Sequence, residues 1–121
     1  MTKRILIVED TLDNRQIMRD LLTSSGYECH EAVDGLQGVE MASTVSPDLI
    51  LMDIQLPKLD GYDTTRRIKA DPATAAIPII AVTSYALSGD ELKARAAGCD
   101  DYLSKPFSPR ELLAHVRRFL G

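Results

Sequence analysis

Three short runs of apolar residues constrain the fold of this chain more than any other feature of its sequence. They are residues 5–8, 49–52 and 79–82, and most of their members are Ile, Val or Leu. Runs that are apolar at every position are typical of strands buried on both faces of a parallel sheet. The sequence therefore predicts three central strands with helices covering both faces of the sheet.

Two shorter segments, residues 27–31 and 101–104, are more polar and alternate as expected for strands at or near a sheet edge. Segments with helical spacing and helix-end signals lie between the strands. These predicted helices lie within residues 11–25, 34–47, 62–70, 88–98 and 108–119. Because strands and helices alternate five times without a linker, the sequence predicts a single α/β domain over residues 1–121.

Three of the predicted helices begin with the pattern of a capping box, in which the cap and the residue three positions later exchange hydrogen bonds. The pairs are Asp34 with Gln37, Ser88 with Glu91, and Ser108 with Glu111. Pro109 occupies the first helical position, where proline is favoured. Gly98 is expected to end the fourth helix, because glycine enters the left-handed region at little cost.

Composition excludes several classes of partner. The chain has 14 Lys and Arg against 18 Asp and Glu, a formal net charge of −4, which gives no general attraction to nucleic acid or anionic membranes. No apolar stretch reaches the length of a membrane span and no signal-peptide pattern is present, so we expect a cytoplasmic protein. Cys29 and Cys99 lack metal-ligand spacing and are expected to be structural, and His30 and His115 are expected on the surface.

Polar residues follow four of the five predicted strands, at the point where each strand ends. Glu9 and Asp10 follow the first strand, Asp53 the third, Thr83 the fourth and Lys105 the fifth. In open α/β sheets, ligands bind beyond the carboxyl ends of the strands. We therefore expect three carboxylates, a hydroxyl and an ammonium to face one crevice.

Three carboxylates in one crevice raise one another's pKa unless a cation compensates their charge. Oxygen ligands without His or Cys favour Mg²⁺ over zinc, and Mg²⁺ usually leaves room for water and a phosphate oxygen. A carboxylate can attack phosphorus to form an acyl phosphate while an ammonium and a hydroxyl bind the phosphoryl oxygens. Asp53 fits the role of the nucleophile, and Lys105 and Thr83 fit the other two.

In order and approximate spacing, these residues resemble the receiver domain of two-component response regulators, and the resemblance covers essentially the whole chain. The matching positions are Glu9, Asp10, Asp53, Pro57, Gly61, Thr83, Lys105 and Pro106. The resemblance implies a flavodoxin-like fold of five βα units in three layers, with the parallel sheet in the order 2-1-3-4-5. It also implies a phosphoacceptor in signalling that catalyses only its own phosphotransfer and slow autodephosphorylation, rather than a conventional enzyme.

The same resemblance implies roles for the acidic residues. Asp53 would be phosphorylated from a histidine phosphodonor. Mg²⁺ would be held by Asp10, Asp53 and the backbone carbonyl of Gln55, with Glu9 assisting through water.

The resemblance further implies a switch at the phosphorylated site. Lys105 would bind the phosphoryl group, Thr83 and Tyr102 would rearrange together on phosphorylation, and the Lys105–Pro106 peptide bond would be cis. Tyr85, two residues after Thr83, is bulky enough to shield the acyl phosphate from water, so autodephosphorylation is expected to be slow.

The implied partners are proteins. A histidine kinase or a histidine phosphotransfer protein would donate the phosphoryl group, and a downstream signalling protein would bind the altered surface of a monomer or weak dimer. No direct contact with nucleic acid or membrane is expected. Residues 51–57 and the lack of an output domain resemble stand-alone receivers, and receivers within hybrid histidine kinases share the same core sequence.

Four other functions compete with phosphosignalling. A phosphohydrolase of the haloacid dehalogenase kind and a Mg²⁺-dependent nucleic-acid enzyme module each need a second Asp two residues after the first, where this chain has Gln55. Nucleotide binding needs a glycine-rich phosphate loop after the first strand, and neither such motif is present. A non-phosphorylated interaction module is disfavoured by the intact set of acidic residues.

Overall fold

The computed structural model describes residues 2–84 and 90–121, and within them five strands and five helices alternate along the chain. The strands are β1 (Arg4–Val8), β2 (Glu28–Ala32), β3 (Leu49–Asp53), β4 (Ile79–Thr83) and β5 (Asp101–Ser104). The helices are α1 (Leu12–Ser24), α2 (Gly35–Val45), α3 (Gly61–Ala70), α4 (Asp90–Ala97) and α5 (Pro109–Leu120). Each predicted strand is confirmed to within one residue at either end.

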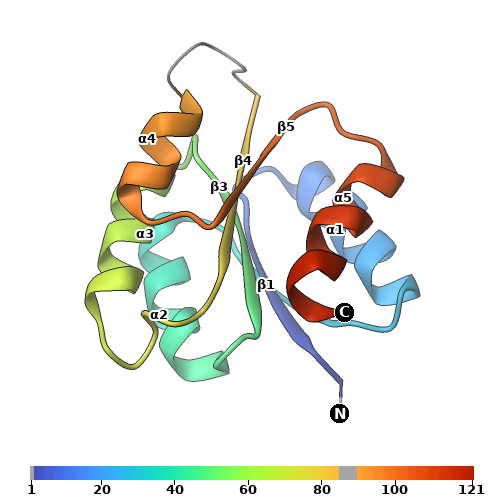
Figure 1. Cartoon of the computed structure of the whole chain (residues 1–121), viewed down its shortest axis with the longest axis horizontal. Helices are drawn as coiled ribbons and strands as arrows, with labels where there is room; N and C mark the ends of the chain where they lie inside the picture. The colour runs from blue at the N-terminus through green and yellow to red at the C-terminus, as the bar shows by residue number, and fades with distance from the viewer. Residues whose placement is uncertain (1, 85–89) are drawn as a thin grey trace.

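The five strands form one parallel sheet in the order β2-β1-β3-β4-β5. The two polar segments form the edge strands β2 and β5, and the three apolar runs form the centre. Helices α1 and α5 cover one face of the sheet, while α2, α3 and α4 cover the other (Figure 1). The predicted flavodoxin-like order and three-layer architecture are therefore confirmed.

The core is divided into two clusters, one on each face of the sheet, because successive side chains of a strand point to opposite faces. The alternating sets are Leu6, Val8, Ile50 and Met52 on one face, and Ile5, Ile7, Leu49 and Leu51 on the other. Ile68 of α3 and Ala94 of α4 pack on the first set. Leu22 of α1 and Leu112 of α5 pack on the second. Burying each Leu or Ile side chain contributes roughly 1.5–3 kcal/mol.

The helix ends follow the predicted signals with one difference. Ser108 and Glu111 form the complete capping box of α5. Asp34 accepts from the N–H of Gln37, but the Gln37 side chain accepts from Val33 rather than from Asp34, so α2 has only half of the predicted box. Gly98 follows α4 with φ +113°, as expected. Ser88, the expected N-cap of α4, lies outside the described residues.

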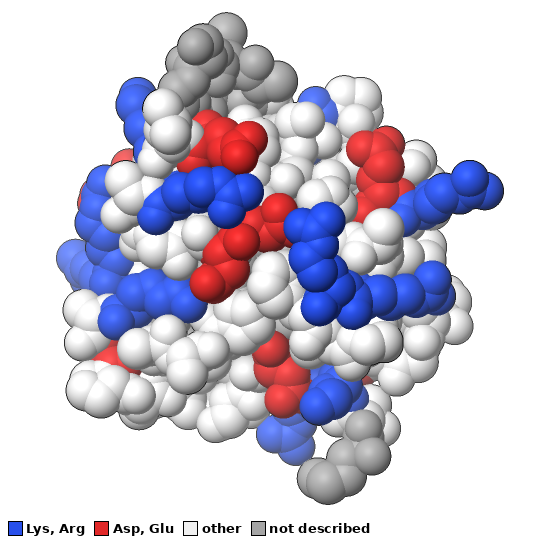
Figure 2. Space-filling view, in the orientation of Figure 1, with Lys and Arg blue, Asp and Glu red and all other residues white. Residues whose placement is uncertain are grey.

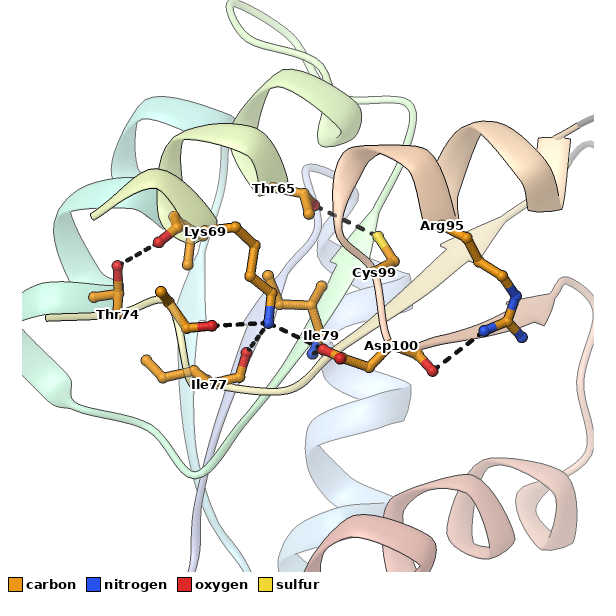
Figure 3. A network of polar contacts seen from close by, with 10 residues as sticks. Thr65, Lys69, Thr74, Ile77, Ile79, Arg95, Cys99 and Asp100 are labelled. Carbon is orange, nitrogen blue, oxygen red and sulfur yellow. Dashed lines mark hydrogen bonds and ion pairs between the residues drawn. The ribbon is translucent and has the colours of Figure 1, made fainter. Parts of the chain in front are cut away.

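Lys69 makes polar contacts with neighbouring segments at the amino ends of the strands (Figure 3). The predicted crevice lies at the other end of the sheet. The Nζ of Lys69, in α3, donates to the carbonyls of Ala75 and Ile77 at 3.2 and 2.6 Å, and lies 3.0 Å from Asp100 Oδ2. The same Asp100 oxygen accepts from the N–H of Ile79 at 2.9 Å. One ammonium therefore links the end of α3, the start of β4 and the turn before β5.

His115 differs from its predicted surface position. Its ring is half-buried, and Nδ1 lies 2.6 Å from Oδ2 of Asp101 on β5. Asp101 is buried and also accepts from Arg118 at 3.3 Å. Because a buried carboxylate needs hydrogen-bonding partners, α5 supplies two of them across the helix–sheet interface.

In Figure 2, Lys and Arg side chains gather at the left and right of the face shown, and Asp and Glu side chains lie between them. Within the described residues, every helix is too short or too polar to cross a bilayer.

Candidate functional site

The acidic residues predicted at the strand ends lie together at the carboxyl edge of the sheet. The parallel register places Val8 beside Met52, so Glu9 and Asp53 follow neighbouring positions of β1 and β3. Glu9, Asp10 and Asp53 each offer a carboxylate oxygen, and these oxygens all lie within 4.8 Å of one another. The order of the strands in the sheet thus brings Asp53 close to Glu9 and Asp10, which lie more than 40 positions earlier in the sequence.

Lys105 adds a cation to this cluster from the connection between β5 and α5. Its Nζ lies 2.6 Å from Glu9 Oε1 and 3.7 Å from Asp53 Oδ2. The N–H of Lys105 donates to the carbonyl of Thr83 at 2.7 Å, which continues the contact between β4 and β5. The Lys105–Pro106 peptide bond is cis, the isomer that the resemblance implies.

Burial makes the charges at this site costly. Glu9 is 0% exposed and Asp53 is 5% exposed, whereas Asp10 is exposed. Burial, and then the neighbouring Glu9 carboxylate, raises the pKa of Asp53 to about 7. Burial also acts to raise the pKa of Glu9, but contacts with Asp53 and Lys105 outweigh it and hold that pKa well below its usual range. At neutral pH the charged partner of Lys105 is therefore Glu9, while Asp53 carries a proton part of the time.

One oxygen of the cluster, Glu9 Oε2, is buried and accepts no hydrogen bond from the described residues. Leaving a buried acceptor unpaired costs about 1–3 kcal/mol, and more for a charged group. A cation, or water bound to one, would satisfy this oxygen. The three grouped residues offer only carboxylate oxygens, the donor type that Mg²⁺ prefers, so the residues fit this ion.

The connection between β3 and α3 contacts the side chain of Asp53, and Gly61 at the start of α3 lies against its backbone. The N–H of Gln55 donates to Asp53 Oδ1 at 3.1 Å, and the N–H of Gly61 donates to the carbonyl of Ile54 at 2.9 Å. A Cβ added at Gly61 would lie 2.4 Å from the carbonyl oxygen of Asp53. Only glycine allows this close approach, so Gly61 helps to fix the backbone that carries the central carboxylate.

Comparison with known proteins agrees with this geometry. The profile of the response regulator receiver domain matches residues 5–117. The chain belongs to the response regulator receiver family. The polar-differentiation response regulator DivK of Brucella ovis is 44% identical over 121 residues, which is 100% of this chain and 98% of that protein. DivK of Brucella anthropi is 43% identical over the same shares of the two chains.

Solved receiver structures match the whole fold. The receiver domain of a sensor histidine kinase from Pseudomonas aeruginosa is 42% identical, with a TM-score of 0.92 over 100% of this chain and 99% of that chain. That domain was crystallised with a magnesium ion coordinated in its active site cleft. The chemotaxis protein CheY4 of Vibrio cholerae is 26% identical, with a TM-score of 0.93 over 98% of this chain and 99% of that chain.

Two further residues predicted for the switch lie on β4 and β5. The Gln55 side chain donates through Nε2 to Thr83 Oγ1 at 3.3 Å, and Thr83 is buried at the end of β4. Tyr102 is half-buried on β5, where it lies beside Ala81 of β4. A joint movement of Thr83 and Tyr102 stays a prediction. Tyr85 lies outside the described residues, so its shielding of an acyl phosphate also stays a prediction.

Arg15 was not predicted from the sequence, although it contacts the connection that carries Glu9 and Asp10. Its Nη1 donates to the carbonyls of Glu9 and Asp10 at 3.1 and 3.2 Å. The available signal was its position early in α1, since the positive end of a helix dipole disfavours a nearby cation. Local acceptors offset this unfavourable interaction, and the connection between β1 and α1 supplies them.

Proposed function

We propose that this receiver accepts a phosphoryl group on Asp53 from a histidine of a histidine kinase or histidine phosphotransfer protein. The observation that carries the proposal is the placement of a buried Asp53 carboxylate within reach of Glu9, Asp10 and Lys105. Transfer of a charged phosphoryl group requires positive charge around the acceptor, which the Lys105 ammonium and a cation held by the carboxylates would supply.

In the proposed step, an Asp53 oxygen attacks phosphorus. The bond between phosphorus and the donor nitrogen breaks, and the imidazole of the donor leaves with the electron pair. The product is an aspartyl phosphate on Asp53 and a free histidine. Lys105, whose ammonium lies 3.7 Å from Asp53 Oδ2, would bind one phosphoryl oxygen, and the Thr83 hydroxyl would donate to another.

Mg²⁺ would be held by Asp10, Asp53 and the carbonyl of Gln55, with Glu9 binding through water. When bound, Mg²⁺ would neutralise charge on the phosphoryl oxygens. The partnerless Glu9 Oε2 supports this assignment, and so does the magnesium in the receiver of the Pseudomonas aeruginosa kinase. The fold would hold the carboxylate oxygens of Glu9, Asp10 and Asp53 close together in the metal-free protein.

The surface beside Lys105 suits a protein donor. A hollow of about 410 Å³ is lined by Lys105, Phe107 and side chains of α1. Ile17 of α1, on the wall of this hollow, is 62% exposed. An apolar wall next to the phosphoacceptor can hold a partner while its histidine reaches Asp53.

We infer that phosphorylation switches protein contacts through Thr83 and Tyr102, and that a downstream signalling protein reads the change. The proposed unit is one receiver domain over residues 1–121, cytoplasmic and monomeric or weakly dimeric. Either a stand-alone regulator or a module of a hybrid histidine kinase would use the site in this way. The chain has similar sequence identity to the response regulator DivK and to the receiver domain of a histidine kinase, 44% and 42%, so both alternatives are proposed.

Intact mass after incubation with Mg²⁺ and acetyl phosphate tests the proposal. We expect one phosphoryl adduct on the wild type, no adduct on Asp53→Asn, and no adduct when EDTA removes Mg²⁺. Asp20→Asn, which changes an exposed carboxyl of α1, should be modified like the wild type. An adduct that persists in Asp53→Asn would refute the assignment.

A further inference from the structure

We propose that Arg15 is a positioning residue for the divalent cation site. It touches neither the cation nor the phosphoryl group. Instead, it holds the connection between β1 and α1 so that Glu9 and Asp10 keep the arrangement that a cation needs. This inference rests on the proposed metal site and assigns it a residue outside the acidic cluster.

The contacts of Arg15 join the metal-site connection to the edge strand β2. Its Nη1 donates to the carbonyl oxygens of Glu9 and Asp10, and its Nε lies 3.2 Å from Glu31 Oε1, near the end of β2. The Arg15 side chain is only 13% exposed. A backbone hydrogen bond also links this connection to β2, since the N–H of Glu9 donates to the carbonyl of Ala32 at 3.0 Å. The planar guanidinium can satisfy these divergent acceptors at once.

The direction of the two carboxylates depends on these carbonyls. The planar peptide units that carry the Glu9 and Asp10 carbonyls also include the Cα atoms of both residues, so fixing the carbonyls restricts where the side chains begin. Asp10 is exposed and lies beyond the last ladder position of β1. Residues that contact metal ligands without touching the metal contribute strongly to metal affinity, because an ion tolerates little displacement of its ligands.

Arg19 provides a matched control in the same helix. It pairs with the same Glu31 through Nη1, but in the described part of the chain it makes no hydrogen bond to the connection between β1 and α1. Its side chain is 52% exposed. Loss of the Glu31 ion pair can therefore be separated from loss of the carbonyl contacts.

The experiment compares wild type, Arg15→Lys and Arg19→Lys, with Mg²⁺ affinity measured by isothermal titration calorimetry. Lysine keeps the positive charge, so long-range attraction or repulsion of the ion is unchanged and only the geometry of the donors differs. We expect Arg15→Lys to weaken Mg²⁺ binding by about tenfold or more, and Arg19→Lys to leave it within about twofold of wild type. A role in folding alone would lower the melting temperature of Arg15→Lys without changing its Mg²⁺ affinity.

Hydrogen exchange of the Glu9 amide in the metal-free protein gives a second measurement that needs no ion. The bond from this amide to Ala32 should open more often in Arg15→Lys, with exchange accelerated by about tenfold, and not in Arg19→Lys. Unchanged Mg²⁺ affinity in a folded Arg15→Lys protein would overturn the inference. If the wild type binds no Mg²⁺, the proposed metal site fails. Amide exchange then decides the positioning role, and an unchanged rate in Arg15→Lys would overturn it.

Discussion

At the scale of single residues, the chemistry of the site follows from placing two carboxyl groups out of water beside one lysine. Lys105 compensates one negative charge, and its closer contact is with Glu9. Asp53 is left as the carboxyl whose ionisation is opposed by burial. Binding a cation relieves this imbalance, because the cation brings a partner for carboxylate oxygens that the described residues leave poorly compensated.

This imbalance predicts a pH dependence of folding stability in metal-free protein. The pKa of Asp53 is higher in the folded chain than in the unfolded chain, so folding takes up a proton between these values. Stability should therefore fall as the pH rises through about 7. Between pH 5 and 8.5 the loss should be roughly 3 kcal/mol, measured by urea unfolding in EDTA.

Asp53→Asn should lack this part of the pH dependence and should be more stable than wild type at pH 8.5. The lowered pKa of Glu9 acts only at more acidic pH, and the two histidines are common to both proteins. Equal slopes of stability against pH for the two proteins would contradict the assigned burial of an ionisable Asp53.

Gly61 makes a second prediction about a single residue. In Gly61→Ala the new methyl carbon would meet the backbone of Asp53 and Ile54 at 2.4 and 2.6 Å, and backbone cannot move aside as a flexible side chain can. We expect a loss of about 2–4 kcal/mol in unfolding free energy together with weaker Mg²⁺ binding. Gly38→Ala, whose methyl would meet side-chain atoms of Val8 at 3.1 Å and of Thr64 at 3.6 Å, should lose less stability and retain Mg²⁺ affinity.

At the scale of secondary-structure elements, the end of the sheet opposite the site is joined by Lys69. Lys69→Met should destabilise the fold by about 1–3 kcal/mol, because it removes the ammonium from two carbonyls and from Asp100. Thermal unfolding of Arg66→Met provides the control, since Arg66 in the same helix makes an exposed pair with Asp63 and its loss should cost under about 1 kcal/mol. Equal effects of the two substitutions would contradict a joining role for Lys69.

The elements were largely predictable from sequence, while contacts between them were less so. Continuous apolar runs identified β1, β3 and β4, because both faces of a central strand are covered by helices. Strand ends then indicated Glu9, Asp53 and Lys105, since parallel strands place their carboxyl ends at one edge. The contacts of Arg15 and His115 could not be predicted from the sequence. Each side chain contacts a residue of another segment, Glu31 and Asp101 respectively, and only folding brings these segments together.

At the scale of the whole molecule, the three-layer fold separates support from chemistry. The central strands, closed by apolar clusters on both faces, provide a rigid frame, and the polar residues extend from one edge of it. Ligands of this architecture bind at that edge for the same reason. The proposed transfer to Asp53 would therefore require little rearrangement of the core, and the proposed change at Thr83 would reach β5 through the β4–β5 pairing.

The location of the phosphoryl group tests this account most directly. After treatment with acetyl phosphate and Mg²⁺, borohydride reduction converts an aspartyl phosphate to homoserine, and tandem mass spectrometry of the peptides identifies the altered residue. We predict conversion at Asp53 and at neither Glu9 nor Asp10. Conversion at another carboxyl group, or a stable adduct on a side chain that borohydride does not reduce, would contradict the account.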